Sequence, residues 1–184
     1  EMPPDDKNDA LDHALPATPE NQGFSIVGIG ASAGGLEALE LFLANVPVNS
    51  GMAFVVIQHL DPSRHGMLPE LLQRATPMAV KQAGNRMKIQ PDCVYVIPPN
   101  KDLSILHNTL YLLDPVAPRG LRLPIDSFLC SLADDKREGA IGVILSGMGS
   151  DGSRGLRAIK ERGGLSLDQA PATAKFDAMP RSAI

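Results

Sequence analysis

A serine, a histidine and an aspartate each follow a short apolar segment of this chain, and together they could perform nucleophilic catalysis. These residues and the segments before them are Ser32 after 24–30, His59 after 53–58 and Asp151 after 141–147. A serine hydroxyl is a weak nucleophile near neutral pH and needs a base, which histidine commonly supplies. A carboxylate can then orient the imidazole and stabilise its protonated form. The three residue types therefore predict a serine hydrolase.

The glycine-rich turn around Ser32 fits two different motifs. Residues 30–34, with the sequence GASAG, match the Gly-x-Ser-x-Gly nucleophile elbow, which holds a serine out at a sharp strand-to-helix turn. The pattern Gly28-x-Gly30-x-x-Ala33 also satisfies the dinucleotide-binding fingerprint. That fingerprint requires an acidic residue at the end of the second strand, whereas this strand ends in a glutamine and a histidine. We therefore rank the elbow first and a dinucleotide-binding domain second; a third interpretation is that Ser32 only caps the following helix.

Asp151 lies in a second glycine-rich turn, which spans residues 147–152 with the sequence GMGSDG. Such a turn could direct the carboxylate toward the histidine, or Asp151 could only be the N-cap of the helix that is predicted to follow. The order serine, histidine, acid along the chain differs from the serine, acid, histidine order of the α/β hydrolases. Because geometry rather than order defines a catalytic triad, both interpretations of Asp151 stay open.

The elements that must position these residues alternate between strands and helices. The predicted strands are 24–30, 53–57, 94–97, 103–106, 110–113, 141–145 and 164–167, and the predicted helices are 34–45, 67–74, 124–136 and 153–162. The segments 103–106 and 110–113 predict an antiparallel hairpin. We therefore predict an α/β fold: a doubly wound, mainly parallel, Rossmann-like sheet with flanking helices and one antiparallel hairpin. Parallel strands place their carboxyl ends at one edge, where the three candidate residues can meet.

The charge and proline distribution divides the chain into a tail and one folded domain. Residues 1–22 carry six acidic side chains, one lysine and four prolines without an apolar period, so we expect a disordered acidic tail. Residues 23–184 are long enough for one domain with a substantial core. We predict no further helix after the segment Met179-Pro180-Arg181, and therefore expect the domain to be truncated at its carboxyl end.

Composition argues against several classes of partner. The whole chain has a net charge of −4 and the tail accounts for −5, so the folded part is nearly neutral, and it has no tryptophan to stack on bases. We therefore expect no nucleic-acid partner. Cys93 and Cys130 are isolated, which predicts no metal site, and we expect no other cofactor. Because the start is acidic and no apolar segment is long enough to span a bilayer, we predict a cytoplasmic protein without membrane insertion.

Four motifs, in order along the chain, resemble those of the chemotaxis CheB-type protein-glutamate methylesterases. They are Gly30-Ala31-Ser32-Ala33-Gly34-Gly35, Ile57-Gln58-His59-Leu60, Ser146-Gly147-Met148-Gly149-Ser150-Asp151-Gly152 and Met179-Pro180-Arg181. The resemblance extends over nearly all of residues 24–184. It implies that Ser32 is the nucleophile, His59 the base and Asp151 the orienting acid. It also implies an oxyanion hole with the backbone N–H of Met148, to which the elbow would add the backbone N–H of Ala33.

The resemblance further implies a substrate and a domain arrangement. The substrate would be a methylated chemoreceptor or a similar helical signalling protein, from which glutamyl methyl esters are hydrolysed to methanol, with glutamine deamidation as a further activity. Ala33 stands where many relatives have threonine, so a hydroxyl is missing there. Stand-alone relatives begin with a receiver domain that residues 1–22 cannot contain. We therefore expect residues 23–184 to be the methylesterase domain of a CheB–CheR-type fusion, with a methyltransferase domain outside this chain; a non-catalytic receptor-docking module is the alternative.

Overall fold

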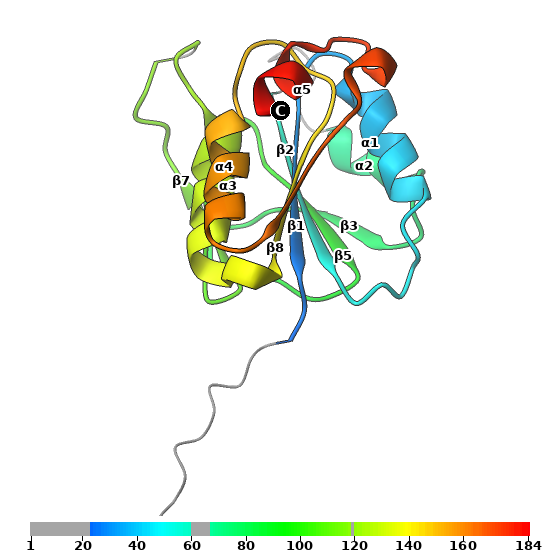
Figure 1. The fold of residues 1–184 in the computed structure, drawn as a ribbon. Helices are drawn as coiled ribbons and strands as arrows, with labels where there is room; N and C mark the ends of the chain where they lie inside the picture. Colours follow the sequence, from blue (N-terminus) through cyan, green and yellow to red (C-terminus); the bar gives the residue numbers. More distant parts are fainter. Residues whose placement is uncertain (1–22, 60–66, 119) are drawn as a thin grey trace, which may run out of the picture.

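The fold is centred on a parallel sheet, seen in a computed structural model that describes residues 23–59, 67–118 and 120–184 (Figure 1). Within these ranges the sheet has six strands, in the order β3-β5-β2-β1-β8-β9, and all adjacent pairs are parallel. Its strands are β1 (Ile26–Ala31), β2 (Ala53–Gln58), β3 (Ala79–Gln82), β5 (Cys93–Val96), β8 (Ala140–Ile144) and β9 (Leu165–Asp168). The predicted doubly wound, mainly parallel sheet is confirmed. The predicted acidic tail, 1–22, lies outside the described residues.

A smaller antiparallel sheet in the same ranges contains the predicted hairpin. Its order is β4-β7-β6, with the bounds Met87–Lys88 for β4, Asp102–Leu106 for β6 and Thr109–Leu113 for β7. Helix α3 (Pro124–Lys136) packs against both β6 and the parallel sheet, and buried residues of all three belong to one apolar cluster. The hairpin therefore lies beside α3, on the same face of the parallel sheet.

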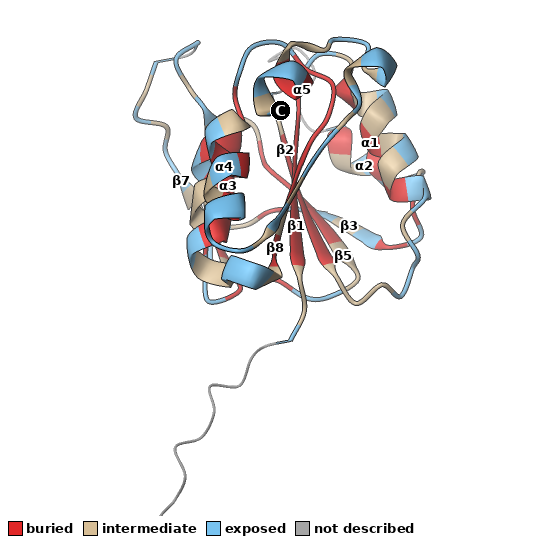
Figure 2. Ribbon diagram, viewed as in Figure 1, coloured by how far each residue is buried: buried red, intermediate tan, exposed pale blue. Residues whose placement is uncertain are grey.

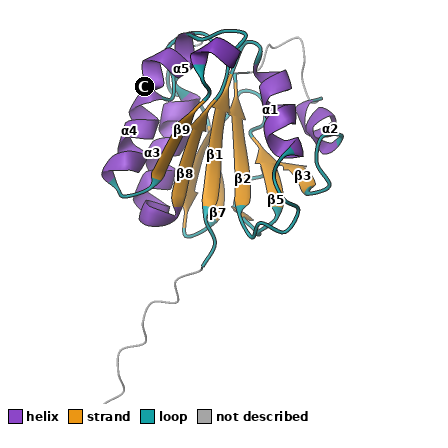
Figure 3. Cartoon of the chain, turned by 45° about the vertical axis from the view of Figure 1, so that its right-hand side comes forward, coloured by secondary structure: helices purple, strands orange, loops and turns teal. Residues whose placement is uncertain are grey.

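Helices cover both faces of the parallel sheet (Figures 1 and 3). One face packs against α1 (Gly35–Ala44) and α2 (Leu68–Gln73), and the other packs against α3 and α4 (Ser153–Glu161). Short elements complete the chain: η2 (Arg137–Gly139), η3 (Pro171–Thr173) and α5 (Ala178–Ala183). No helix of the described ranges combines the length and the apolar character that crossing a membrane would require.

Each central strand contributes to two separate apolar cores, because successive side chains of a strand point to opposite faces. In β2, Val55 and Ile57 belong to the core under α3, while Phe54 and Val56 belong to the core under α1. Figure 2 shows the central strands β1, β2, β5 and β8 as a buried layer between partly exposed helices. Strands buried on both faces read as unbroken apolar segments, which is why the sequence predicts them well.

Two glycines of β1 allow α3 to pack directly on the strand. A Cβ atom on Gly28 would lie 2.6 Å from Leu129 Cδ2, and one on Gly30 would lie 2.5 Å from Ile125 Cγ2. These are the glycines that also fit the dinucleotide fingerprint. Their close contact with α3 explains them by helix packing, without a bound nucleotide.

The sequence predicts most of the helices and strands and misses a few short ones. The predicted bounds of α3 agree with the structure, whereas β3 and β4 were not predicted. The segment Met179-Pro180-Arg181, after which the sequence predicts no further helix, itself lies within α5, which the sequence does not predict. A six-residue helix has too few internal hydrogen bonds to form alone, and α5 depends on the burial of Met179 and Pro180.

Candidate active site

The register of the parallel sheet places Ser32 and His59 next to each other. Ala31, the last residue of β1, pairs with Gln58, the last residue of β2, so the two candidates are the next residue on each of two adjacent strands. The backbone N–H of His59 donates to the carbonyl of Ala31, with an N–O distance of 3.3 Å. On the other side of β1, the backbone N–H of Ser32 donates to the carbonyl of Ser146 at 3.0 Å. Backbone hydrogen bonds between the strands therefore hold Ser32 beside His59.

His59 and Asp151 form the shortest contact of the site. The Nε2 atom of His59 lies 2.7 Å from Asp151 Oδ2, and these residues are 92 positions apart in the chain. A carboxylate only accepts hydrogen bonds, so this contact favours the imidazole tautomer with the proton on Nε2. The Nδ1 atom is then the nitrogen with a free lone pair. The histidine side chain is 37% exposed and that of the aspartate 6%, so the base faces solvent and the acid does not.

The carboxylate of Asp151 is held by the N-terminus of α3 rather than by its own helix. Its Oδ2 accepts from the backbone N–H of Ile125 at 3.0 Å, and its Oδ1 accepts from that of Asp126 at 2.8 Å. The first backbone N–H groups of a helix have no partner within the helix and favour an anion. The interpretation of Asp151 as the N-cap of the following helix is therefore wrong: Gly152 holds that position in α4 and makes no side-chain cap.

Ser32 lies at the turn between β1 and α1 with its hydroxyl bonded inside the protein. The backbone N–H of Met148 donates to Ser32 Oγ at 2.9 Å, and the hydroxyl donates to the thioether of Met179 at 3.3 Å. No hydrogen bond joins Ser32 to His59 among the described residues. The interpretation of Ser32 as a helix cap is also wrong, because α1 has Gly34 at its N-cap, at φ 70°, without a side-chain cap.

A segment near the carboxyl end of the chain packs against the serine turn. The Ser146 hydroxyl contacts the carbonyl of Ala33 at 3.0 Å and accepts from the backbone N–H of Phe176 at 3.0 Å. The backbone N–H of Gly147 donates to the Phe176 carbonyl at 3.0 Å, and that of Met179 donates to the Gly147 carbonyl at 3.1 Å. These hydrogen bonds position the buried Met179 side chain next to Ser32, although the two residues are 147 positions apart in the chain.

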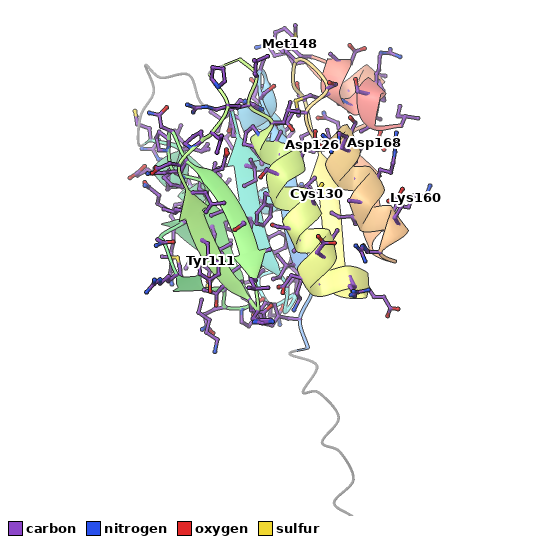
Figure 4. The ribbon with its side chains drawn as sticks, turned by 90° about the vertical axis from the view of Figure 1, so that its left-hand side faces the viewer. Tyr111, Asp126, Cys130, Met148, Lys160 and Asp168 are labelled. Atoms are coloured by element: carbon purple, nitrogen blue, oxygen red, sulfur yellow. The ribbon has the colours of Figure 1, made fainter. Side chains whose placement is uncertain are left out.

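A second buried carboxylate, which the sequence analysis did not single out, lies behind Asp151. Asp126 Oδ1 accepts from the backbone N–H groups of Gly152 at 3.0 Å and Gly155 at 2.7 Å. Burial, and then the charge of Asp151, raise the pKa of Asp126, although the two backbone N–H groups oppose this. Figure 4 places Asp126 toward the end of α3 that is nearer Met148. The sequence does contain a signal for Asp126: it follows Pro124 in the first turn of a predicted helix, where acidic residues are favoured.

The predicted site residues thus gather at one edge of the sheet. The structure brings Ser32 to Met148 and His59 to Asp151 by direct hydrogen bonds, and the sheet register places these two pairs side by side. Ala33 follows Ser32 in the same turn and is exposed. Within the described part of the chain, no group of three or more His, Cys, Asp or Glu residues could hold a metal ion.

A parallel α/β sheet with a serine turn, a histidine and a buried aspartate at its carboxyl edge is typical of serine hydrolases. The comparisons with known proteins define the group more narrowly. The family model described as CheB methylesterase matches residues 27–184, and this chain belongs to that family.

Individual relatives agree with this assignment. A Leptospira interrogans protein, provisionally named a protein-glutamate methylesterase/protein-glutamine glutaminase, is 35% identical over 162 residues, covering 88% of this chain and 84% of its own length. Protein-glutamate methylesterase/protein-glutamine glutaminase 1 of Geobacter sulfurreducens is 36% identical, but this chain spans only 46% of it. The crystal structure of the Thermotoga maritima CheB methylesterase catalytic domain matches with a TM-score of 0.79 and 29% identity, covering 88% of this chain and 87% of that one.

Proposed function

We propose that this chain is a protein-glutamate methylesterase in which Ser32, His59 and Asp151 form the catalytic triad. The substrate is the γ-methyl ester of a glutamyl side chain, and the products are methanol and the free carboxylate. The observation that carries this proposal is the 2.7 Å contact between His59 Nε2 and Asp151 beside a serine turn, in a chain of the CheB methylesterase family. The names of the relatives support the same activity.

In the first step Ser32 Oγ attacks the ester carbonyl while His59 accepts its proton. Asp151 occupies Nε2, so Nδ1 is the atom that accepts the proton. The serine hydroxyl must first turn away from the Met179 thioether, which is a weak acceptor and gives up the proton at little cost. The imidazolium that forms is stabilised by the buried Asp151 carboxylate.

Two backbone donors are placed to stabilise the negatively charged oxygen of the tetrahedral intermediate. The Met148 N–H already lies 2.9 Å from Ser32 Oγ, so an oxygen bonded to the attacked carbon falls within its reach. The Ala33 N–H makes no hydrogen bond to another described residue and can be the second donor. One such donor contributes about 3 to 4 kcal/mol to the transition state.

Three further proton transfers complete the reaction. His59 gives its proton to the departing methoxide, so that methanol leaves and the substrate stays attached to Ser32 as an acyl ester. His59 then takes a proton from water, and the resulting hydroxide attacks the acyl carbon. The intermediate releases Ser32 Oγ, which recovers its proton from His59. The new carboxyl group loses its proton to solvent at neutral pH, so the glutamyl side chain leaves with one additional negative charge.

We also propose that the same site deamidates glutamine side chains. The relatives carry the glutaminase name beside the methylesterase name. We propose a methylated chemoreceptor or a similar helical signalling protein as the substrate, a cytoplasmic location, and a fused methyltransferase domain as a neighbour in the full protein.

Methanol release from a methylated chemoreceptor fragment tests the activity. We expect release by the native chain and a loss of at least about 10³-fold in Ser32→Ala, because the covalent intermediate cannot form. Ser104→Ala, on the β6 strand of the hairpin, is the matched control and should release methanol at the native rate. A native chain that binds the fragment without releasing methanol would instead identify a docking module.

A further inference from the structure

The N-termini of α3 and α4 hold each other through two aspartates. Asp151, in the turn before α4, accepts from the first-turn N–H groups of α3, and Asp126, in the first turn of α3, accepts from the N–H groups of Gly152 and Gly155 at the start of α4. Asp126 takes part in both pairs. Its carboxylate accepts from the N–H groups of α4, and its own backbone N–H is one of the two donors to Asp151. The four bonds therefore form one closed unit.

The surrounding packing leaves this unit little room to move. A Cβ atom on Gly155 would lie 2.5 Å from Leu129 Cβ, so the backbone of α4 lies directly against α3. Gly152 has a φ of 102° and would clash with Ile144 Cδ1, 2.3 Å away, if it carried a side chain. Asp126 itself is only 6% exposed. Burying a carboxylate costs free energy, and the hydrogen bonds from Gly152 and Gly155 offset part of that cost.

We infer that Asp126 is a positioning residue for the hydrolysis: its carboxylate holds the turn that carries Asp151 against α3 and so keeps the Asp151 carboxylate at bonding distance from His59. Asp126 touches neither the substrate nor the reacting atoms. It acts on the imidazole through Asp151. The inference rests on the proposed triad and adds a residue to it.

Replacing Asp126 in two ways separates this role from simple stabilisation. Asp126→Ala removes the acceptor and leaves two buried N–H groups without a partner, whereas Asp126→Asn keeps an acceptor oxygen at the position of Oδ1. We expect kcat per folded protein to fall about 10- to 100-fold in Asp126→Ala, with KM unchanged, since a displacement of about 1 Å at a catalytic group can cost about 100-fold. Asp126→Asn should restore kcat to within about threefold of the native value, because it restores the positioning bonds.

Asp135→Ala is a matched control on the same helix. Asp135, in the last turn of α3 and so at the opposite end of the helix from Asp126, accepts from the backbone N–H groups of His107 at 2.8 Å and Asn108 at 3.4 Å. Its removal should lower the melting temperature, as Asp126→Ala does, but leave kcat at the native value. Equal kcat in Asp126→Ala and Asp135→Ala would overturn the inference and leave Asp126 a purely structural residue.

A spectroscopic measurement makes the outcome independent of the substrate. The proton shared by His59 Nε2 and Asp151 should give a low-field ¹H NMR signal, assigned by its absence in His59→Gln. We expect this signal in the native chain, Asp126→Asn and Asp135→Ala, and its loss or marked shift in Asp126→Ala. An unchanged signal in folded Asp126→Ala would refute the positioning role. If the native chain shows the signal but releases no methanol, the proposed function fails while the positioning of Asp151 is still tested.

Discussion

The candidate site has an acid side and a nucleophile side that differ in how their polar atoms are bonded. The acid side is Asp151 with the N-termini of α3 and α4; its side chain is 6% exposed, and its carboxylate has two backbone donors besides His59. The nucleophile side is Ser32 with the backbone of Met148 and the side chain of Met179. There the Met148 side chain is 59% exposed, and the serine hydroxyl is bonded to groups that it must leave before it can react.

This difference suggests that the two sides contribute at different stages of catalysis. The acid side is complete before a substrate arrives, so it should influence the chemical step without changing binding. The nucleophile side must exchange its internal hydrogen bonds for bonds to the substrate, so changes there should alter both binding and chemistry. Variants on each side test this difference.

The largest effect on the acid side is expected from Asp151→Asn. An amide in place of the carboxylate cannot stabilise the imidazolium and can favour the wrong tautomer of His59, so kcat should fall about 10³- to 10⁴-fold. KM should stay within about twofold, because the side chain is buried away from the substrate. Steady-state methanol release measures both parameters. A loss of less than about tenfold would show that the acid is not needed for the proton transfer.

On the nucleophile side, Met148→Pro removes a single backbone donor. Proline has no N–H, so the bond to Ser32 and the proposed contact with the oxyanion are both lost, and kcat should fall about 10²- to 10³-fold. Met148→Ala keeps the N–H and removes only the exposed side chain, so it should change KM more than kcat. Comparable kcat losses in the two variants would mean that the side chain, and not the donor, matters. Circular dichroism of both variants checks that the fold is retained.

A smaller effect is expected where the two sequence-distant segments of the nucleophile side meet. A Cβ atom on Gly147 would lie 2.2 Å from Met179 Sδ and 2.5 Å from Ser32 Oγ. Gly147→Ala should therefore displace both side chains, lower the free energy of unfolding by about 1 to 3 kcal/mol and reduce kcat about tenfold. Gly139→Ala is the control, since its Cβ would be 3.7 Å or more from its neighbours. A native-like rate in Gly147→Ala would show that the serine is not confined by this contact.

The comparison also shows which parts of the site the sequence can predict. Ser32 and His59 directly follow strands that are buried on both faces, so apolar segments alone locate them at one edge. The pairing of Ala31 with Gln58, which places the two residues side by side, is a property of the folded sheet and its register. Helix α3 is equally well predicted, because Pro124 is favourable in a first helical turn and a long apolar pattern follows.

The contacts between distant segments could not be predicted in the same way. Asp151 bonds to backbone groups 25 and 26 positions earlier in the chain, and a backbone N–H leaves no trace in the residue type. The N-cap interpretation of Asp151 accordingly considers α4, the next helix, whereas the backbone partners of its carboxylate lie in α3. The short α5, with Pro180 inside it, has no local signal either, so the contact of Met179 with Ser32 was missed.

The smallest expected effect concerns the pH dependence of stability on the acid side. The pKa of Asp126 is raised in the folded chain by burial and by the facing charge of Asp151, with Arg154 of α4 opposing and Cys130 nearby on α3. A carboxyl with a raised folded pKa stabilises the fold fully below its unfolded pKa of about 3.9, and this contribution is lost as pH rises through the folded pKa. Asp126→Asn does not titrate, so it lacks this contribution.

The free energy of unfolding of the native chain should therefore fall relative to that of Asp126→Asn as pH rises above about 4, and the difference should then become constant. Denaturant titrations of both proteins across this range measure it. The nucleophile side offers no buried carboxylate to titrate, so Met179→Leu should show a constant difference from the native chain over the same range. A native-minus-Asn difference that grows with pH would mean that the backbone N–H groups of α4, and not burial, dominate the Asp126 carboxyl.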